Sequence, residues 1–234
     1  MARKARFLVA LLICLALFSN GALAAGKLVS AQESLLVLPY YSDGYYGYVF
    51  AELTNAGDKP VEFSSGLVEL FDADGNSIAS SDVYYCYPPV MQPGENSYIF
   101  TYGYVATREE DFIDDYMLSV TGKGTISRDI ARLNSTARYE QISDGYSTYG
   151  YLIAVIENNT ENVLYDCTVV YAMKDADGKP LYAASTSWSG YNTGVMPGSF
   201  IEMRTQIGSD MRDYMDGNNI VPASMESIAY YYVN

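Results

Sequence analysis

The sequence contains no histidine, and its 234 residues include only one tryptophan and three cysteines. Without histidine the chain lacks the base of a Ser-His-Asp triad, the imidazole ligands of zinc sites and the usual proton carrier near neutral pH. Basic residues are also scarce, because 14 Lys and Arg stand against 28 Asp and Glu, a formal charge of −14. A chain this acidic repels phosphate backbones and anionic membrane surfaces, so nucleic acid is not an expected partner.

Long apolar runs are missing after the N-terminus. The run from Phe7 to Phe18 follows a basic start and precedes small residues up to Ala25, and it is shorter than the roughly 20 residues that span a bilayer. These three parts predict a signal peptide over residues 1–24, with Ala25 as a competing cleavage site. The mature chain is expected to be secreted or extracytoplasmic, with no membrane insertion. Its formal charge becomes −17, because 11 basic residues remain against 28 acidic ones.

An internal repeat organises the rest of the chain. Asp72-Ala73-Asp74-Gly75 returns 103 positions later as Asp175-Ala176-Asp177-Gly178, and Asn158 matches Asn55 at the same spacing. Each Asp-Ala-Asp-Gly segment lies between two β-type runs, which predicts the turn of a hairpin. Alternating apolar residues recur in both copies: Val49, Ala51 and Leu53 in the first, Leu152, Ala154 and Ile156 in the second. Short alternating strands between frequent turns predict an all-β fold of two tandem antiparallel β-sandwiches.

The repeat also predicts the domain limits. The first sandwich is expected over residues 25–121, a polar linker over 122–137 and the second sandwich over 138–234. The acidic segment Glu109–Asp115 is expected to form one helical turn, and Arg212–Asp216 echoes it in the second copy.

The order of these features resembles the FxLYD domain of secreted and surface bacterial proteins. The family's motif, Phe-x-Leu-Tyr-Asp, appears in modified form as Val68-Glu69-Leu70-Phe71-Asp72 and as Tyr171-Ala172-Met173-Lys174-Asp175, where Lys174 replaces an aromatic residue. The resemblance covers nearly all of the mature chain, twice. It implies immunoglobulin-like β-sandwiches and an extracytoplasmic location. The family has no common enzymatic activity or site residues, so the resemblance assigns none.

Two features could carry metal or thiol chemistry. Carboxylates at alternate positions of the Asp-Ala-Asp-Gly segments suit calcium, but the position for the twelfth ligand is Val83 in one copy and Thr186 in the other. We therefore expect structural turns, with no metal and no cofactor. The mature cysteines are Cys86 and Cys167. A disulfide between them would join the two modules, whereas alternation points Cys167 inward, so we expect two unpaired thiols.

Tyrosine is abundant, with 24 copies. Consecutive tyrosines on a strand point to opposite faces, so part of each cluster has to face water, a partner or the other module. The candidate ligand-binding residues are Tyr45, Tyr46, Tyr84, Tyr85, Tyr87 and Trp188.

These patterns predict an exported, non-enzymatic bacterial protein that binds a protein or glycan at the cell envelope. One alternative is a purely structural spacer. The other is a carboxylate-based glycoside hydrolase, although no pair of acids stands out in the sequence.

Overall fold

A computed structural model describes residues 26–40, 44–105, 113–126, 130–190 and 193–233. The predicted signal peptide and most of the acidic segment before Ile113 lie outside these residues. The described chain is mostly strand, with one helix, so the all-β prediction is confirmed. No described helix has the length and apolar character needed to cross a membrane.

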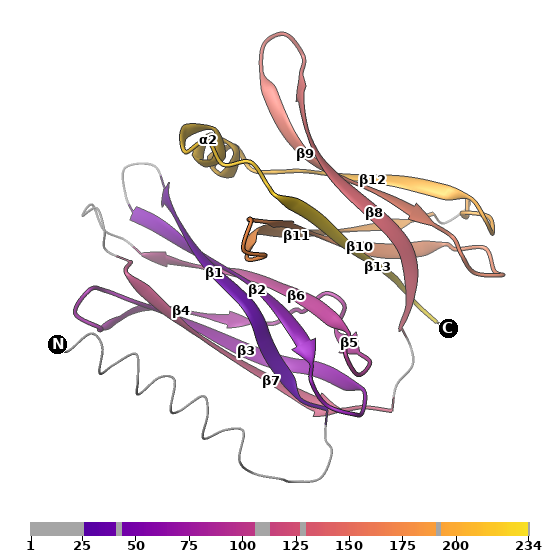
Figure 1. The fold of residues 1–234 in the computed structure, drawn as a ribbon, viewed down its shortest axis with the longest axis horizontal. Helices are drawn as coiled ribbons and strands as arrows, with labels where there is room; N and C mark the ends of the chain where they lie inside the picture. Colours follow the sequence, from indigo (N-terminus) through magenta and orange to yellow (C-terminus); the bar gives the residue numbers. More distant parts are fainter. Residues whose placement is uncertain (1–25, 41–43, 106–112, 127–129, 191–192, 234) are drawn as a thin grey trace.

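The first module consists of two facing sheets (Figure 1). One sheet has the order β1-β2-β6, and in the other β3 lies between β7 on one side and β4 with β5 on the other. Its strands are β1 (Leu28–Tyr40), β2 (Gly44–Asn55), β3 (Val61–Phe71), β4 (Ser77–Val83), β5 (Val90–Met91), β6 (Asn96–Val105) and β7 (Asp115–Gly124). The alternation predicted for β2 is confirmed, because Val49, Ala51 and Leu53 lie fully buried in the core between the two sheets.

The second module has its strands in a corresponding order, except that no described strand matches β5 and a helix precedes the last strand. Its elements are β8 (Ile130–Ser143), β9 (Thr148–Glu157), β10 (Asp166–Lys174), β11 (Pro180–Ser189), β12 (Phe200–Gln206), α2 (Ser209–Gly217) and β13 (Ser224–Tyr232). The strands β11-β10-β13 form one face and β8-β9-β12 the other. Leu152, Ala154 and Ile156 of β9 are fully buried, as their alternation predicts.

Strand β8 differs from the prediction. Residues 130–133 pair with β13 and residues 134–143 pair with β9, so one strand joins both sheets of the second module. Most of the linker predicted over 122–137 therefore belongs to strands, since β7 ends at Gly124 and β8 begins at Ile130. The local sequence of β8 is polar enough to resemble a linker, and residues 130–133 form a strand by pairing with β13, about 100 residues later in the chain.

The helix α2 is also longer than the single turn that the acidic pattern suggested. It spans nine residues and buries Met211 and Met215, which lie one turn apart on the same face. These methionines close one end of the second sandwich.

Two buried asparagines hold equivalent turns in the two modules. The side-chain nitrogen of Asn55 donates to the carbonyls of Lys59 and Met91 at 2.8 and 3.1 Å. The side-chain nitrogen of Asn158 donates to the carbonyls of Asn162 and Val195, both at 2.8 Å. The match between these positions in the sequence therefore has a structural cause, because each amide satisfies carbonyls of the same two loops.

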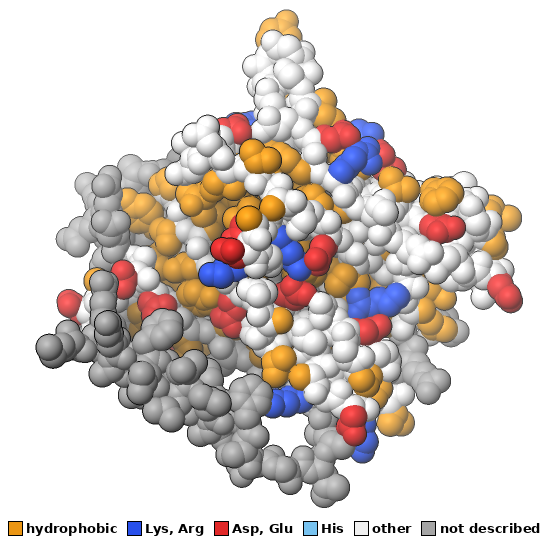
Figure 2. Space-filling view, viewed as in Figure 1, with side chains coloured by type: hydrophobic (Ala, Val, Ile, Leu, Met, Phe, Trp, Pro, Cys, Tyr) orange, Lys and Arg blue, Asp and Glu red, His pale blue; other side chains and the backbone are white. Residues whose placement is uncertain are grey.

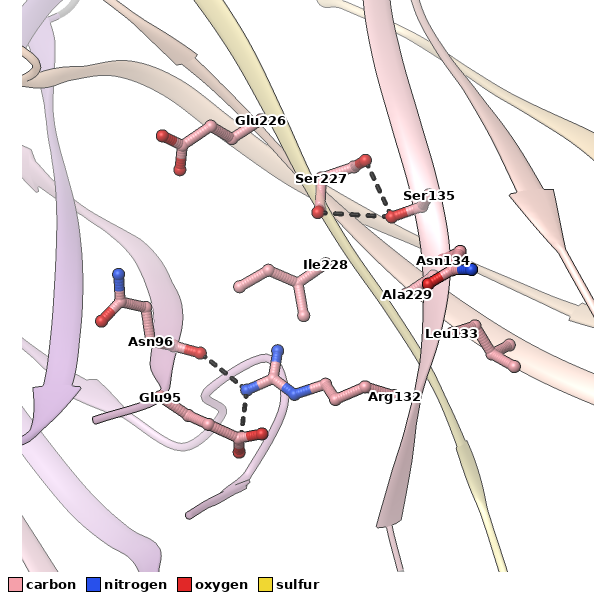
Figure 3. Close-up of a pocket in the computed structure, with 10 residues that line it drawn as sticks. All are labelled: Glu95, Asn96, Arg132, Leu133, Asn134, Ser135, Glu226, Ser227, Ile228 and Ala229. Carbon is pink, nitrogen blue, oxygen red and sulfur yellow. Dashed lines mark hydrogen bonds and ion pairs between the residues drawn. The ribbon is translucent and has the colours of Figure 1, made fainter. Parts of the chain in front are cut away.

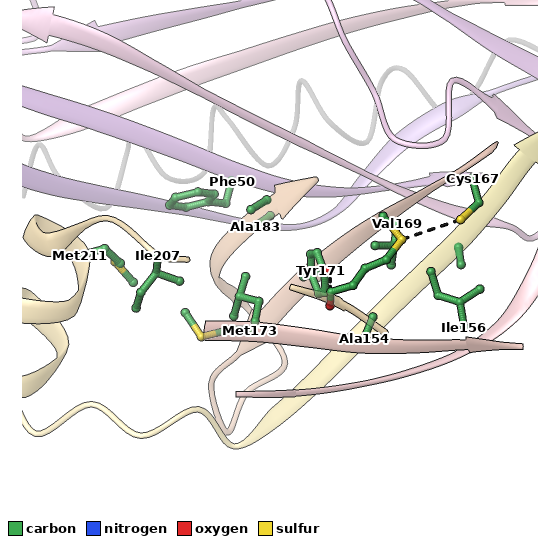
Figure 4. Close-up of a cluster of buried hydrophobic side chains, with 14 of the residues drawn as sticks. Phe50, Ala154, Ile156, Cys167, Val169, Tyr171, Met173, Ala183, Ile207 and Met211 are labelled. Carbon is green, nitrogen blue, oxygen red and sulfur yellow. Dashed lines mark hydrogen bonds between the residues drawn. The ribbon is translucent and has the colours of Figure 1, made fainter. Parts of the chain in front are cut away.

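The two modules pack face to face, with β1-β2-β6 of the first against β11-β10-β13 of the second (Figure 1). Leu36, Leu38 and Phe50 of the first module belong to the same buried cluster as Ile207 and Met211 of the second. Figure 4 shows Phe50, Ile207 and Met211 in this cluster. A cluster that crosses the boundary makes the contact resemble a continuous hydrophobic core.

At the centre of this contact, the large ring of Tyr98 packs against the small side chains of Val170 and Ala172. All three are fully buried. The seam between the modules is thus a close-packed joint, and the candidate site lies along it.

Candidate binding site

A ladder of aromatic side chains covers the face of β2 and β6 that points toward the second module. Three cross-strand pairs form it: Tyr46 opposite Tyr104, Tyr48 opposite Tyr102, and Phe50 opposite Phe100. Each strand supplies every second residue, because alternate side chains point to the same face of a sheet. The Tyr46 and Tyr102 rings meet edge to face, with centroids 5.1 Å apart. We call these six residues the aromatic ladder.

Glycines support the ladder from below. Gly47 and Gly103 are cross-strand partners, and they lie between the pair that contains Tyr46 and the pair that contains Tyr48. A Cβ atom at Gly47 would lie 2.7 Å from Leu70 Cδ1, and one at Gly103 would lie 2.9 Å from the same atom. The core side chain of Leu70 therefore packs directly against the backbone beneath the tyrosines, which only glycine permits.

The second module covers only part of the ladder. Phe50 is buried against it, with the Tyr182 ring centroid 5.6 Å away, whereas Tyr102 remains 54% exposed. In the space-filling view, hydrophobic side chains gather between the two modules (Figure 2). The ladder thus runs from the joint out to the solvent.

A groove of about 670 Å³ opens where the ladder leaves the joint. Strands β2, β4 and β6 and the segment after β4 form one wall, and β11 forms the other. Its lining residues are Tyr48, Phe50, Ser81, Asp82, Val83, Tyr84, Tyr85, Tyr87, Phe100, Thr101, Tyr102, Tyr182, Ala183, Ala184 and Ser185. This volume lies within the range of about 300–1,000 Å³ found for small-molecule sites. We call it the aromatic groove.

Two tyrosines at the edge of the groove are the most exposed of its rings. Tyr84 is 71% exposed and Tyr85 is 69% exposed. The Tyr85 ring stacks on Tyr87 at 6.3 Å, and Tyr87 stacks on Phe100 at 5.4 Å with the planes 11° apart. The Tyr84 hydroxyl donates to Asp82 Oδ2 at 2.9 Å, and this hydrogen bond raises the pKa of Tyr84. These contacts hold the exposed rings in fixed orientations.

Polar side chains lie among the rings. Ser81 Oγ and Thr101 Oγ1 share a hydrogen bond of 3.2 Å on the first-module wall, and Ser185 lines the opposite wall. A smaller pocket of about 100 Å³ adjoins the groove through Tyr48, Phe50 and Tyr182 and ends at α2. Burial, and then the charge of Asp210 in this smaller pocket, raises the pKa of Tyr48. The lining thus combines apolar ring faces with hydroxyls and carboxylates.

The structure places four of the six candidate residues at or beside this site. Tyr84, Tyr85 and Tyr87 line the groove, and Tyr46 belongs to the ladder. Tyr45 points the other way and packs on the core of the first sandwich, because neighbouring residues of a strand face opposite sides.

Trp188 lies outside the groove. It is the cross-strand partner of Cys167 and packs on the core cluster of the second sandwich, half-buried. Sequence reasoning missed three groove residues, Tyr48, Tyr102 and Tyr182. The alternation of aromatics at residues 46, 48 and 50 and at 100, 102 and 104 was the signal for the ladder.

A buried ion cluster fixes the joint beside the ladder. Lys174 Nζ contacts Glu52 Oε2 at 2.7 Å and Glu226 Oε2 at 2.8 Å. The Tyr98 hydroxyl donates to Glu226 at 2.5 Å, and Asn96 donates to Glu52 at 2.5 Å. Burial lowers the pKa of Lys174, but its hydrogen bonds to the two carboxylates outweigh this, so the pKa lies above the usual value. Lys174 therefore bridges acids of both modules.

This cluster does not have the properties of a glycosidase pair. Burial raises the pKa of Glu226, but the hydrogen bonds from Lys174 and Tyr98 reverse the effect, and the pKa lies below the usual value. A general acid needs a raised pKa, and here both carboxylates are occupied by one lysine.

A polar cleft of about 450 Å³ lies between the modules where the loop before β6 meets β8 and β13 (Figure 3). Arg132 reaches across it to Glu95 Oε2 at 3.3 Å and to the Asn96 carbonyl at 2.9 Å. Ser227 and Ser135 bond to each other on its far wall. The polar groups of the cleft already form hydrogen bonds with one another, so we interpret the cleft as a further part of the joint.

The cysteines and the aspartate turns have structural roles. Both described cysteines are free, as predicted, and both are buried, which the alternation predicted for Cys167 alone. Burial raises the pKa of Cys86 to about 12 and that of Cys167 to about 11, which suppresses the nucleophilic thiolate. Asp72 Oδ1 accepts the backbone N–H groups of Asp74 and Asn76 at 3.0 and 2.8 Å.

The second turn repeats this pattern. Asp175 Oδ1 accepts the backbone N–H groups of Asp177 and Lys179 at 2.9 and 2.8 Å. Gly75 and Gly178 both adopt positive φ, at +84° and +80°. Each first carboxylate therefore holds its own turn, which accounts for the repeated segment without a cation. Among the described residues, no three Asp, Glu, Cys or His side chains cluster in a way that would hold a metal ion.

No family model and no curated protein matches this chain. Among solved structures, the chain is similar to a red sea bream transglutaminase at 7% sequence identity and a TM-score of 0.21. The alignment covers 77% of this chain and 27% of that one. A likeness this small relates neither the folds nor the activities of the two proteins.

Proposed function

We propose that this chain is an exported, non-enzymatic bacterial protein that binds a protein or glycan at the cell envelope. Its modules are two immunoglobulin-like sandwiches of the FxLYD type, and the aromatic groove between them is the binding site. The observation that carries the proposal is the exposure of Tyr84 and Tyr85 beside a groove of about 670 Å³.

Exposed aromatic rings leave apolar surface in contact with water, which is unfavourable unless a ligand covers them. Tyrosine combines an apolar face with a polar hydroxyl and has few rotatable bonds, so it loses little entropy when a ligand covers it. Neighbouring rings and Asp82 already orient the groove tyrosines. A pre-organised aromatic edge around a groove is typical of a ligand site.

The test is retention of purified residues 25–234 on isolated envelope fractions. We expect the double variant Tyr84→Ser/Tyr85→Ser to lose most of this retention, since it removes the two exposed rings while leaving the core intact. The matched control is Tyr165→Ser, because Tyr165 is 56% exposed and lines neither the groove nor the smaller pocket.

Equal retention of the double variant and the wild type would refute the assignment of the groove. The spacer alternative predicts no specific retention of any version of the chain. The hydrolase alternative predicts release of new reducing ends from a bound glycan, which the proposed function excludes.

A further inference from the structure

The aromatic groove has a distinctive charge. Of the described residues that line the groove and the smaller pocket, the charged ones are Asp82 and Asp210, both acidic. A ligand that carries phosphate, sulfate or carboxylate groups along its length would meet these carboxylates with no lysine or arginine to offset them. The site therefore disfavours anionic polymers.

The groove is also elongated. It shares Tyr48, Phe50 and Tyr182 with the smaller pocket, so the depression continues along the joint toward α2. Tyr84 and Tyr85 line the groove and do not line the smaller pocket, so they add length on the side away from α2. Such a shape matches a linear chain better than a compact small molecule.

The lining alternates ring faces with hydroxyls. Tyr87 stacks on Phe100 in the wall, and the bonded hydroxyls of Ser81 and Thr101 lie on the neighbouring strands. A sugar ring has one face of C–H groups and an edge of hydroxyls, so it needs both an aromatic plane and short polar side chains. A folded protein partner would need a flatter surface with a wider rim.

We propose that the aromatic groove binds a neutral polysaccharide chain, with sugar rings stacked on Tyr84, Tyr85 and Tyr102. Hydroxyls of the sugar bond to Asp82 and to the serine and threonine side chains of the two walls. This inference rests on the proposed function and narrows its ligand to one chemical class.

The experiment is affinity electrophoresis of residues 25–234 in native gels that contain a soluble polysaccharide. The neutral probes are a mixed-linkage β-glucan, a galactomannan and dextran, and the anionic probe is polygalacturonate. We expect retardation in at least one neutral gel and none in polygalacturonate. Loss of one stacked ring should weaken binding by about fivefold to tenfold, so Tyr102→Ser is a milder variant than Tyr84→Ser/Tyr85→Ser.

Tyr165→Ser should be retarded as strongly as the wild type. Circular dichroism of every variant shows whether the sandwich fold is kept, and Tyr102→Ser provides a second readout if the double variant does not fold. Normal mobility in all neutral gels, or retardation that the groove variants leave unchanged, would overturn the inference.

The envelope assay separates the two proposals. Groove-dependent retention that protease treatment of the envelope fraction abolishes would keep the proposed function and overturn the polysaccharide ligand. Groove-dependent retention that survives protease treatment supports both. Absence of retention on every fraction, together with normal mobility in every gel, would overturn both.

Discussion

Replacing Lys174 with methionine should test how much the buried ion cluster contributes to the joint between the modules. Lys174 is 6% exposed, and its ammonium group contacts Glu52 and Glu226 at 2.7 and 2.8 Å. Methionine fills similar space without the charge. The variant would leave the carboxylate of Glu52, which is 7% exposed, without its cation.

The size of the effect follows from this burial. Removing one partner of a buried ion pair costs about 3–5 kcal/mol, because the other charge stays desolvated. Water can reach Glu226, whose side chain is 48% exposed, so the cost comes mainly from Glu52. We expect Lys174→Met to lower the free energy of unfolding by about 3 kcal/mol.

Urea denaturation followed through the fluorescence of Trp188 and through far-UV circular dichroism measures this loss. The core shared by the two modules predicts that both signals change in one transition, which allows a two-state treatment. The matched control is Glu52→Gln/Lys174→Met, which removes the stranded charge and should recover most of the stability.

The pH dependence provides a check on the same reasoning. The lowered pKa of Glu226 means that its ion pair stabilises the fold above the usual pKa of about 4.3 and that this stabilisation is lost as the pH falls further. The stability difference between wild type and Lys174→Met should therefore narrow on acidification. A loss under about 1 kcal/mol at neutral pH, or a control as unstable as the single variant, would refute the argument.

Two further predictions concern the cores. Asn158→Ala should lower the free energy of unfolding by about 2–3 kcal/mol in the same urea assay, since it removes two hydrogen bonds of 2.8 Å to the carbonyls of Asn162 and Val195 and the side-chain oxygen that accepts from Thr160; a change under about 0.5 kcal/mol would contradict this. Cys86 and Cys167 should resist a disulfide reagent at pH 8 in the native state and react fully in urea, because burial raises both thiol pKa values; rapid labelling of the folded chain would show that the thiols are accessible.

The local parts of the fold could be predicted from the sequence. The Asp-Ala-Asp-Gly turns depend on a carboxylate that bonds to backbone groups two and four residues away and on a glycine at positive φ. The alternation of β2 and β9 directly reflects which residues face each core. These features depend only on neighbouring residues, so they can be recognised in the sequence of either module.

The parts that could not be predicted depend on distant pairing. In the sequence, Lys174 is only a departure from a motif. Its role as an ion-pair partner depends on Glu52, which is 122 residues away and lies across the joint. The start of β8 resembles a linker in sequence because β13, which pairs with its first four residues, follows much later.

The candidate site was predicted only in part for the same reason. Tyrosine clusters pointed to Tyr84, Tyr85 and Tyr87, but a groove needs two walls. The second wall, with Tyr182 and Ser185, belongs to the other module. The sequence alone could not show which of Tyr45 and Tyr46 faces the site. The strand orientation shows that Tyr45 packs on the core of the first sandwich and that Tyr46 belongs to the ladder.

The two modules meet through unlike faces. The sheet β1-β2-β6 corresponds in order to β8-β9-β12, and the sheet containing β3, β4 and β7 corresponds to β11-β10-β13. The joint is therefore a head-to-tail contact, which leaves one copy of each face unused at opposite ends of the molecule. Contacts of this type have no built-in stopping point and can add units into a filament.

The unused faces carry exposed ion pairs. Glu62 pairs with Lys123 at 3.1 Å on one outer face, and Arg138 pairs with Glu202 at 3.1 Å on the other. A third sheet could cover these hydrated ions only by stripping their water. Burying these ion pairs would cost free energy, so the outer faces disfavour the stacking of further copies of this chain through the same kind of contact.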